Sequence, residues 1–316
     1  MAKPKVYIDG QEGTTGLRIF ERFAGRNDIE ILTIDPALRK DADERKKLIN
    51  ASDITFLCLP DAAAKEAVSL VESDHVRIID ASTAHRTAPG WAYGFAELSS
   101  AHREAIATGK RIANPGCHAT GFVSLVYPLV SAGVLPADTA LTCFSLTGYS
   151  GGGMKMIAQY GDENRDPALD SPRIYGLTHS HKHLPEMKAV CGLDAAPLFT
   201  PIVADYYAGM LVSVPLMAGQ MKGISSLAQL HECYADHYAG QKMVSVMPLS
   251  AQADVGGFLA ANACAGWDGL KIYVTGNDER MMACALFDNL GKGASGAAVQ
   301  SMNIMLGCDE ATGLNL

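Results

Sequence analysis

Cys117 is the side chain whose chemical type and place in the sequence most directly suggest catalysis. It lies in the segment 112–121, which reads IANPGCHATG, and Pro115 and Gly116 predict a turn just before it. A helix is expected next, because the following apolar residues share one helical face: Phe122, Leu125, Val126 and Leu129. A cysteine at a helix start faces unpaired backbone N–H groups and the positive end of the helix dipole, which favour the nucleophilic thiolate. The alternative is a small buried apolar side chain, as most cysteines outside disulfides are.

The segment 178–186, THSHKHLPE, supplies the partner that a thiolate nucleophile needs. Histidine titrates near neutrality, so it can take the thiol proton and later return it as an acid. The alternative is a polar loop whose histidines at 179, 181 and 183 are incidental. Zinc is a further alternative, but the cluster has no nearby cysteine and no His-Glu-x-x-His pattern. We therefore predict an acid–base histidine here and no metal site.

A glycine-rich turn follows the first expected strand, Lys5 to Asp9. Residues 10–16 read GQEGTTG, and the apolar residues after the turn have helical spacing: Leu17, Phe20, Phe23 and Ala24. A strand, a glycine turn and a helix form the phosphate-binding start of a dinucleotide fold, in which the helix N-terminus holds the pyrophosphate. The spacing is Gly-x-x-Gly-x-x-Gly rather than Gly-x-Gly-x-x-Gly, and such glycines can serve a turn alone. Their place after the first strand favours cofactor binding by Gly10, Gly13, Thr14, Thr15 and Gly16.

Strands and helices continue to alternate up to Cys117. The segments with strand character are 30–34, 54–59, 76–80 and 111–113, and helices are expected at 43–49 and after Pro60. Strands with crossover helices imply a doubly wound parallel sheet, which binds ligands at the carboxyl ends of its strands. The segments at such ends are 10–16, 59–60 with Pro60 as a further cofactor contact, 81–86, and Cys117. One crevice is expected to gather them.

After about residue 135 the pattern changes to longer strands, several with period-two alternation. They are expected at 139–146, 211–216, 244–248 and 270–275, with a helix at 225–238. The segment 288–306 is glycine-rich and then helical, and its inner face carries Val299, Met302, Asn303 and Leu306. The predicted fold class is therefore α/β: a Rossmann-type doubly wound dinucleotide-binding domain plus an α+β catalytic domain on a mixed or antiparallel sheet. The expected domains are 1–117, 118–286 for catalysis and oligomerisation, and 287–316, a helix that packs back on the first domain.

Composition excludes several classes of protein. The chain has 316 residues, 48% hydrophobic and 19% charged, with a formal net charge of −8, as in ordinary globular proteins. It has no Lys/Arg run that would mark a nucleic-acid or membrane surface, and no stretch of apolar residues long enough to span a membrane. The eight cysteines are scattered without a CxxC pattern, and no signal peptide precedes the first strand. We expect a cytoplasmic protein with a small-molecule substrate and neither a nucleic-acid nor a membrane partner.

Taken together, these motifs resemble the N-acetyl-γ-glutamyl-phosphate reductase family in its shorter form, along nearly the whole chain. The motifs of the first half are GQEGTTG at 10–16, FLCLP at 56–60, IDASTAHR at 79–86, YGFAE at 93–97 and NPGCHATG at 114–121. Those of the second half are GYSGGG at 148–153, HKHLPE at 181–186 and DNLGKG at 288–293. Residue 118 is His, where the longer family form usually has an aromatic residue. That departure leaves the nucleophile unaffected.

The resemblance implies NADPH-dependent reduction of N-acetyl-glutamyl 5-phosphate to the 5-semialdehyde and phosphate, a step of arginine biosynthesis. Cys117 would form a thioester, and His183 would do the acid–base work, with His181 as the alternative or as a substrate contact. Candidate groups for the substrate anions are Ser82, Arg86, Ser150 and Gly151, since an Arg fork or a backbone nest binds phosphate and carboxylate. The resemblance also implies a cofactor contact at Asn289, and a homo-oligomer, dimer or tetramer.

The cofactor and the rival functions leave alternatives open. Asp35 lies about twenty residues beyond the glycine turn, where an acid binds the ribose 2′-hydroxyl and favours NAD. The resemblance indicates NADP, and Thr14, Thr15, Arg39 and Lys40 are candidate partners for the 2′-phosphate. We predict NADP, because Asp35 precedes Pro36 and can turn away. Rival functions are an aspartate-semialdehyde-dehydrogenase-like reductase of another acyl phosphate, a non-catalytic NADP-binding sensor, and a cysteine acyl hydrolase.

Overall fold

The protein is described by a computed structural model, which covers residues 2–316. The chain forms two compact units. The first unit comprises the residues up to Pro115 together with Ala294–Leu314, and the second comprises Gly116–Gly293 with Asn315–Leu316. Cys117 therefore falls at the start of the second unit. The expected functional domains, 1–117, 118–286 and 287–316, stay a prediction.

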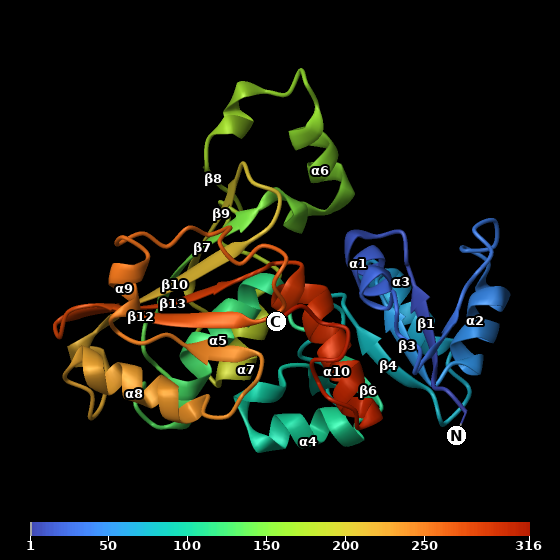
Figure 1. The fold of residues 1–316 in the computed structure, drawn as a ribbon, viewed down its shortest axis with the longest axis horizontal. Coiled ribbons are helices and arrows are strands. Elements are labelled where there is room, and N and C mark those ends of the chain that lie inside the picture. The colour runs from blue at the N-terminus through green and yellow to red at the C-terminus, as the bar shows by residue number, and fades with distance from the viewer. Residues whose placement is uncertain (1) are drawn as a thin grey trace. The chain divides into compact units, whose positions relative to one another are not determined.

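The first unit is built on a six-stranded sheet in the order β2-β1-β3-β4-β6-β5, with every pair of strands parallel (Figure 1). Its strands are β1 (Lys5–Asp9), β2 (Glu30–Leu32), β3 (Ile54–Leu57), β4 (Arg77–Asp80), β5 (Ala92–Tyr93) and β6 (Arg111–Ala113). Its helices are α1 (Thr14–Arg22), α2 (Ala42–Ala51), α3 (Asp61–Ser69), α4 (Ser100–Thr108), α10 (Gly296–Leu306) and the short η1 (Ala96–Leu98). The strand order reverses between β1 and β3, which places the ligand-binding edge of a doubly wound sheet there.

Alternate residues of the central strands feed two separate cores in the first unit. Ile54 and Phe56 of β3 point into a core shared with α1, α4 and α10, whereas Leu57 joins a core with α2 and α3. This period-two division explains the continuous apolar run of β3, since both faces of the strand are buried. The C-terminal helix α10 contributes Val299 and Met302 to the first of these cores.

The second unit carries a seven-stranded mixed sheet in the order β11-β12-β13-β10-β7-β9-β8. The pairs β11–β12 and β7–β9 are parallel and the others antiparallel. The strands are β7 (Thr142–Gly148), β8 (Arg173–Ile174), β9 (Leu198–Ala204), β10 (Met210–Met217), β11 (Val244–Val246), β12 (Leu270–Gly276) and β13 (Arg280–Phe287). The fold class expected from the sequence, a Rossmann-type domain plus an α+β domain on a mixed sheet, is confirmed.

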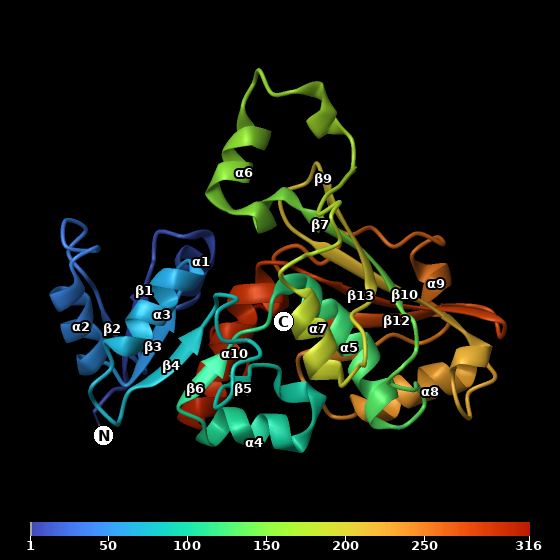
Figure 2. The same cartoon turned by 180° about the vertical axis from the view of Figure 1, so that it is seen from behind.

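Helices α5, α7 and α8 lie on one face of this sheet (Figure 2). The helices of the second unit are α5 (Cys117–Ser131), α6 (Gly153–Gly161), α7 (Leu184–Cys191), α8 (Leu227–His237) and α9 (Ala251–Asp254). The short helical turns are η2 (Tyr149–Gly152), η3 (Pro167–Asp170), η4 (Ala218–Gln220) and the π-helical η5 (Gly291–Ser295). Helix α5 packs on β10 and β13 so closely that a Cβ on Gly121 would lie 2.3 Å from a methyl carbon of Val212. No helix among residues 2–316 is long and apolar enough to cross a membrane.

Three local expectations differ from the structure. Phe20 and Phe23 pack in the core as the spacing predicts, but Leu17 is exposed and Ile19 is buried, so the inner face of α1 is rotated away from Leu17. Helix α5 is buried on nearly all sides rather than along one stripe, because it lies at the centre of the second unit. The strands β9 and β13 were not predicted, although β13 pairs along its length with β10 and β12.

Candidate active site

The glycine turn after β1 is tight, and two of its glycines have no room for a side chain. Gly10 has φ +88°, and a Cβ there would lie 2.4 Å from the carbonyl oxygen of Cys58, after β3. A Cβ on Gly16 would lie 2.4 Å from the carbonyl oxygen of Gly10. The Gly13 amide donates to that same carbonyl at 3.1 Å. Only glycine permits this packing of the turn against the carboxyl ends of β1 and β3.

The N-terminus of α1 has the properties of a phosphate site. The helix begins at Thr14, and its N-cap, Gly13, brings no side chain to satisfy the first N–H groups. Within residues 2–316, the buried Thr14 hydroxyl oxygen has no hydrogen-bond partner. Unsatisfied donors at a helix N-terminus bind anions, so this turn fits the diphosphate of a dinucleotide. Thr15 lies in the same first turn of α1.

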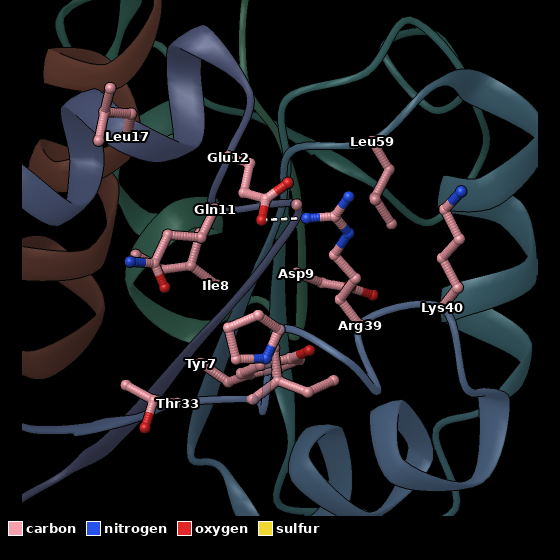
Figure 3. A pocket seen from close by; sticks show the side chains of 13 residues that line it. Tyr7, Ile8, Asp9, Gln11, Glu12, Leu17, Thr33, Arg39, Lys40 and Leu59 are labelled. Atoms are coloured by element: carbon pink, nitrogen blue, oxygen red, sulfur yellow. Dashed lines mark hydrogen bonds and ion pairs between the residues drawn. The ribbon is translucent and has the colours of Figure 1, made fainter.

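A pocket of about 460 Å³ lies beside the turn (Figure 3). Its lining comprises Tyr7, Ile8, Asp9, Gly10, Gln11, Glu12, Leu17, Thr33, Ile34, Pro36, Arg39, Lys40 and Leu59. Arg39 and Lys40 follow β2, and Arg39 forms an ion pair with Glu12 of the turn. Asp35 is outside this lining, and its carboxylate accepts from the Ala37 amide at 2.9 Å. The Asp35 carboxylate therefore caps its own loop, whereas Lys40 and the Glu12-paired Arg39 line the pocket.

The segment 81–86 forms a hydrogen-bonded turn after β4 in the first unit. Ser82 donates through its hydroxyl to the buried carboxylate of Asp80 at 2.7 Å, and the His85 ring nitrogen Nδ1 lies 2.6 Å from the same carboxylate. Arg86 donates to the carbonyl oxygens of Asn114 and Ala81, both at 3.1 Å. Ser82 thus has its proton engaged by Asp80, and its role toward a substrate anion stays a prediction, as does that of Arg86. Pro60 is the N-cap of α3.

Cys117 is the first residue of α5, and its position is fixed from two sides. Gly116 is the N-cap, and the first turn of α5 contains no acidic side chain that would oppose a thiolate. The buried carboxylate of Glu186 accepts from the Gly116 amide at 2.8 Å. A Cβ on Gly293 would lie 3.0 Å from the Cβ of Cys117, so Gly293 packs directly against the cysteine. The Cys117 side chain remains partly exposed.

His181 and His183 lie together, in contact with the residue that follows the cysteine. His183 is the buried N-cap of α7, and its amide donates to His181 Nδ1 at 3.2 Å. Their ring centroids are 4.8 Å apart, and each is 5.5 Å from the His118 ring. The structure therefore brings both predicted histidines to the start of α5. Within residues 2–316, no group of three or more metal-ligating side chains is arranged to hold an ion.

Ser150 and Gly151 lie in η2, in a loop held by Asn289. Asn289 donates to the Ser150 hydroxyl at 3.0 Å and accepts from the Gly209 amide at 2.8 Å. A Cβ on Gly151 would lie 3.4 Å from the same Asn289 amide nitrogen. The buried Asn289 side chain is thus used inside the second unit, where it holds the Ser150 loop. Its cofactor contact, expected from the resemblance, stays a prediction.

Several residues of the site were missed from the sequence. Glu186 and Gly293 belong to motifs that had been recognised, but their contacts with the Cys117 turn had no sequence signal of their own. His118 was noted only as a departure from the longer family form, and Tyr175, which bonds to it, was not considered. The sequence signal that could have indicated this cluster is the histidine directly after the predicted nucleophile, at a position where the longer family form usually has an aromatic residue.

Comparisons with known proteins cover nearly the whole chain. Residues 16–108 match the family described as "Semialdehyde dehydrogenase, NAD binding domain", and residues 117–289 match "Semialdehyde dehydrogenase, dimerisation domain". N-acetyl-gamma-glutamyl-phosphate reductase 2 of Nostoc sp. is 47% identical, over 99% of this chain and 100% of that protein. N-acetyl-gamma-glutamyl-phosphate reductase of Brucella ovis is 49% identical, over 96% of this chain and 99% of its own.

Two solved structures share the fold at low sequence identity. Aspartate semialdehyde dehydrogenase from Francisella tularensis aligns with a TM-score of 0.72 at 13% identity, over 96% of this chain and 100% of that one. Aspartate semialdehyde dehydrogenase with NADP from Candida albicans aligns with a TM-score of 0.63 at 14% identity, over 96% of this chain and 99% of its own. At this identity the likeness establishes the two-part architecture alone.

Proposed function

This chain belongs to the N-acetyl-gamma-glutamyl-phosphate reductase family, and we propose that it reduces N-acetyl-glutamyl 5-phosphate to N-acetyl-glutamate 5-semialdehyde and phosphate in arginine biosynthesis. It is an oxidoreductase of the semialdehyde dehydrogenase type. The observation that carries the proposal is the placement of Cys117 as the first residue of a buried helix, with His181 and His183 packed against its neighbour. A nucleophile paired with an acid–base group is the arrangement that acyl transfer requires.

The first half of the reaction is acyl transfer to the cysteine. His183 takes the thiol proton, and Cys117 Sγ attacks the acyl-phosphate carbon. The bond to the phosphate oxygen breaks, phosphate leaves with its electron pair, and a thioester remains on Cys117. The N-terminus of α5 stabilises the thiolate, because its dipole and unpaired N–H groups favour negative charge. Glu186 holds the Gly116 amide, so it fixes the start of that helix.

The second half reduces the thioester. When bound, the nicotinamide cofactor supplies a hydride, which converts the thioester carbon to that of a hemithioacetal. The Gly10–Gly16 turn and the N-terminus of α1 would hold its diphosphate, and the pocket lined by Arg39 and Lys40 would hold the adenosine end. The oxyanion of the hemithioacetal then re-forms the carbonyl, the C–S bond breaks with its electron pair on Sγ, and His183 returns its proton to the departing sulfur, which restores the Cys117 thiol and releases the aldehyde. Substrate anions are assigned to Ser82, Arg86, Ser150 and Gly151.

The proposal is tested most directly in the reverse direction. N-acetyl-glutamate semialdehyde, NADP and inorganic phosphate are mixed with the protein, and absorbance at a wavelength specific for reduced nicotinamide is followed. We expect an increase that depends on phosphate. An increase that does not need phosphate, or that is larger with aspartate semialdehyde, would contradict the proposed reaction. Hydrolysis of an acyl phosphate with no change in the nicotinamide would indicate an acyl hydrolase instead.

Cofactor preference is a separate prediction. We expect kcat/KM for NADPH to exceed that for NADH by at least tenfold, about 1.4 kcal/mol of differential binding. Arg39 and Lys40 line the pocket and can neutralise a 2′-phosphate, whereas the Asp35 carboxylate is engaged by the Ala37 amide. Steady-state assays with both nicotinamides decide the preference. Arg39→Ala should reduce it, with Arg18→Ala as a control on the exposed surface of α1. Equal use of NADH would mean that Asp35 reads the ribose.

Assembly and location complete the proposal. We assign the chain to a homo-oligomer, a dimer or tetramer, through the exposed face of the second unit's sheet. Phe144 on β7 and Leu198 on β9 are exposed there on neighbouring strands, as is Met282 on β13. A cytoplasmic location fits the cysteines, since no disulfide joins any of them within residues 2–316.

A further inference from the structure

His118 is a buried polar residue that the proposed reaction does not use. It is the second residue of α5, directly after Cys117, and its side chain is almost completely buried. Both ring nitrogens have a hydroxyl partner. Nδ1 lies 2.6 Å from the Ser145 hydroxyl on β7, and Nε2 lies 2.6 Å from the Tyr175 hydroxyl, just after β8. A buried imidazole with both nitrogens satisfied has a single orientation, because any rotation would leave a polar atom without a partner.

The His118 ring is also the centre of an aromatic cluster. His181 meets it edge-on at a centroid distance of 5.5 Å, and His183 lies tilted at the same distance. Phe199 of β9 packs against both His118 and His181 at 5.2 Å. Tyr175 lies 5.9 Å from the His181 ring. His181 and His183 therefore both contact the ring that the two hydroxyl groups hold in place.

Burial, together with the nearby His181 and Lys182, lowers the pKa of His118 to about 3. The titratable groups around His118 are those two residues, the adjacent Cys117, His183 at the start of α7, and Tyr175. Burial raises the pKa of Tyr175, as does the charge of Cys117. Both partners of the Nε2 hydrogen bond therefore stay uncharged near neutral pH. A neutral imidazole donates at one nitrogen and accepts at the other, so the ring links the hydroxyl of Ser145 to that of Tyr175.

We propose that His118 is a positioning residue: through its hydrogen bond to Tyr175 and its ring contacts with His181 and His183, it fixes the orientation in which the acid–base histidine meets the Cys117 thiol. The inference rests on the proposed function for the identity of the reaction alone. The proposed pairing of thiol and histidine does not require substrate, so it can be measured separately. An inert aromatic side chain at this position would fill the space but would leave the Tyr175 hydroxyl without its buried partner.

Two conservative variants separate the hydrogen bonds. The amide nitrogen of glutamine lies close to the place of Nε2, and that of asparagine close to the place of Nδ1. His118→Gln therefore keeps a partner for Tyr175, whereas His118→Asn keeps one for Ser145. We expect kcat to fall by roughly 10–100-fold in His118→Asn and His118→Phe, as for a small misplacement of a catalytic group, with KM changed less than about threefold. His118→Gln should retain most of the wild-type kcat.

Tyr175→Phe should lower kcat as much as His118→Asn does. Because both changes break the same hydrogen bond, the double variant should be no slower than either single variant, rather than showing the product of the two effects. Tyr234→Phe is the matched control, since its buried hydroxyl also bonds to α5, at the Leu125 carbonyl and outside this cluster. It should leave kcat unchanged. Thermal unfolding of every variant checks that the fold is retained.

Alkylation of Cys117 by iodoacetamide gives a readout that needs neither substrate nor cofactor. The rate is followed for the Cys117 peptide by mass spectrometry near neutral pH. His118→Asn, His118→Phe and Tyr175→Phe should slow it by roughly tenfold, because a misplaced histidine no longer takes the thiol proton, and His118→Gln should not. Wild-type alkylation and kcat in folded His118→Phe would overturn the inference, as would multiplicative effects in the double variant. If the protein does not reduce the acyl phosphate but the alkylation pattern holds, the proposed function fails and this inference stands.

Discussion

Cys117→Ser is expected to lower kcat by three orders of magnitude or more, roughly the loss seen when a covalent nucleophile is removed. Serine keeps the helix start and the space that the side chain fills, but its hydroxyl is a far weaker nucleophile than a thiolate at neutral pH. Binding of NADPH should persist, because the cofactor turn lies in the first unit and the cysteine at the start of the second. Steady-state rates and a fluorescence titration with NADPH measure the two effects.

The control for this variant is Cys308→Ser, which makes the same replacement of sulfur by oxygen at an exposed cysteine just after α10. Cys58 and Cys143 are further controls, and substitution of each should matter little to the chemistry. Retention of about a tenth of wild-type turnover by Cys117→Ser would rule out a covalent intermediate on this residue. Trapping of an acyl group on the Cys117 peptide under single-turnover conditions would detect the covalent intermediate directly.

His183→Asn is expected to lower kcat by roughly 10²–10⁴-fold, the usual range for a lost acid–base group. The substitution is mild for the fold, because His183 is the N-cap of α7 and asparagine is a favourable residue there. His181→Asn should act mainly on KM. Its amide oxygen can still accept from the His183 amide, as His181 Nδ1 does at 3.2 Å. Rates across a pH series for both variants separate catalysis from substrate binding.

The reverse pattern, with kcat controlled by His181 and KM by His183, would exchange the two roles and leave the cysteine mechanism intact. Wild-type kcat in both variants would show that neither histidine takes the thiol proton. A double variant tests a third case, in which the proton passes from one histidine to the other. Removing the second histidine would then add little to the loss from the first.

The cofactor half of the molecule could be predicted well because its signals are local. Strand β1, the glycine turn and the start of α1 follow one another in the chain, so a single short segment contains the whole motif. Strand β3 is predicted by apolar residues that do not alternate with polar ones, Ile54, Phe56 and Leu57, because both faces of a parallel sheet are buried. The exposed Leu17 shows the limit, because helical spacing does not say which face meets the core.

The second half was predicted less completely for a physical reason. Strands β9 and β13 are defined by pairing with β7, β10 and β12, and their partners come from distant parts of the chain. Helix α5 looked amphipathic by its spacing, yet it is buried almost all round by elements that follow it in sequence. Periodicity reports one face of a segment, whereas burial depends on everything that packs against it.

The sequence by itself predicted the candidate nucleophile, the histidine segment and the dinucleotide fold, because each is a short motif whose chemistry depends on neighbouring residues. The tertiary structure alone decided how these parts are held. Glu186 meets the Gly116 amide from 70 positions away, and Asn289 reaches Ser150 from 139 positions away. His118 binds Tyr175 across 57 positions. Such contacts form when elements pack, and no local pattern of residue types encodes which distant group will satisfy a buried polar atom.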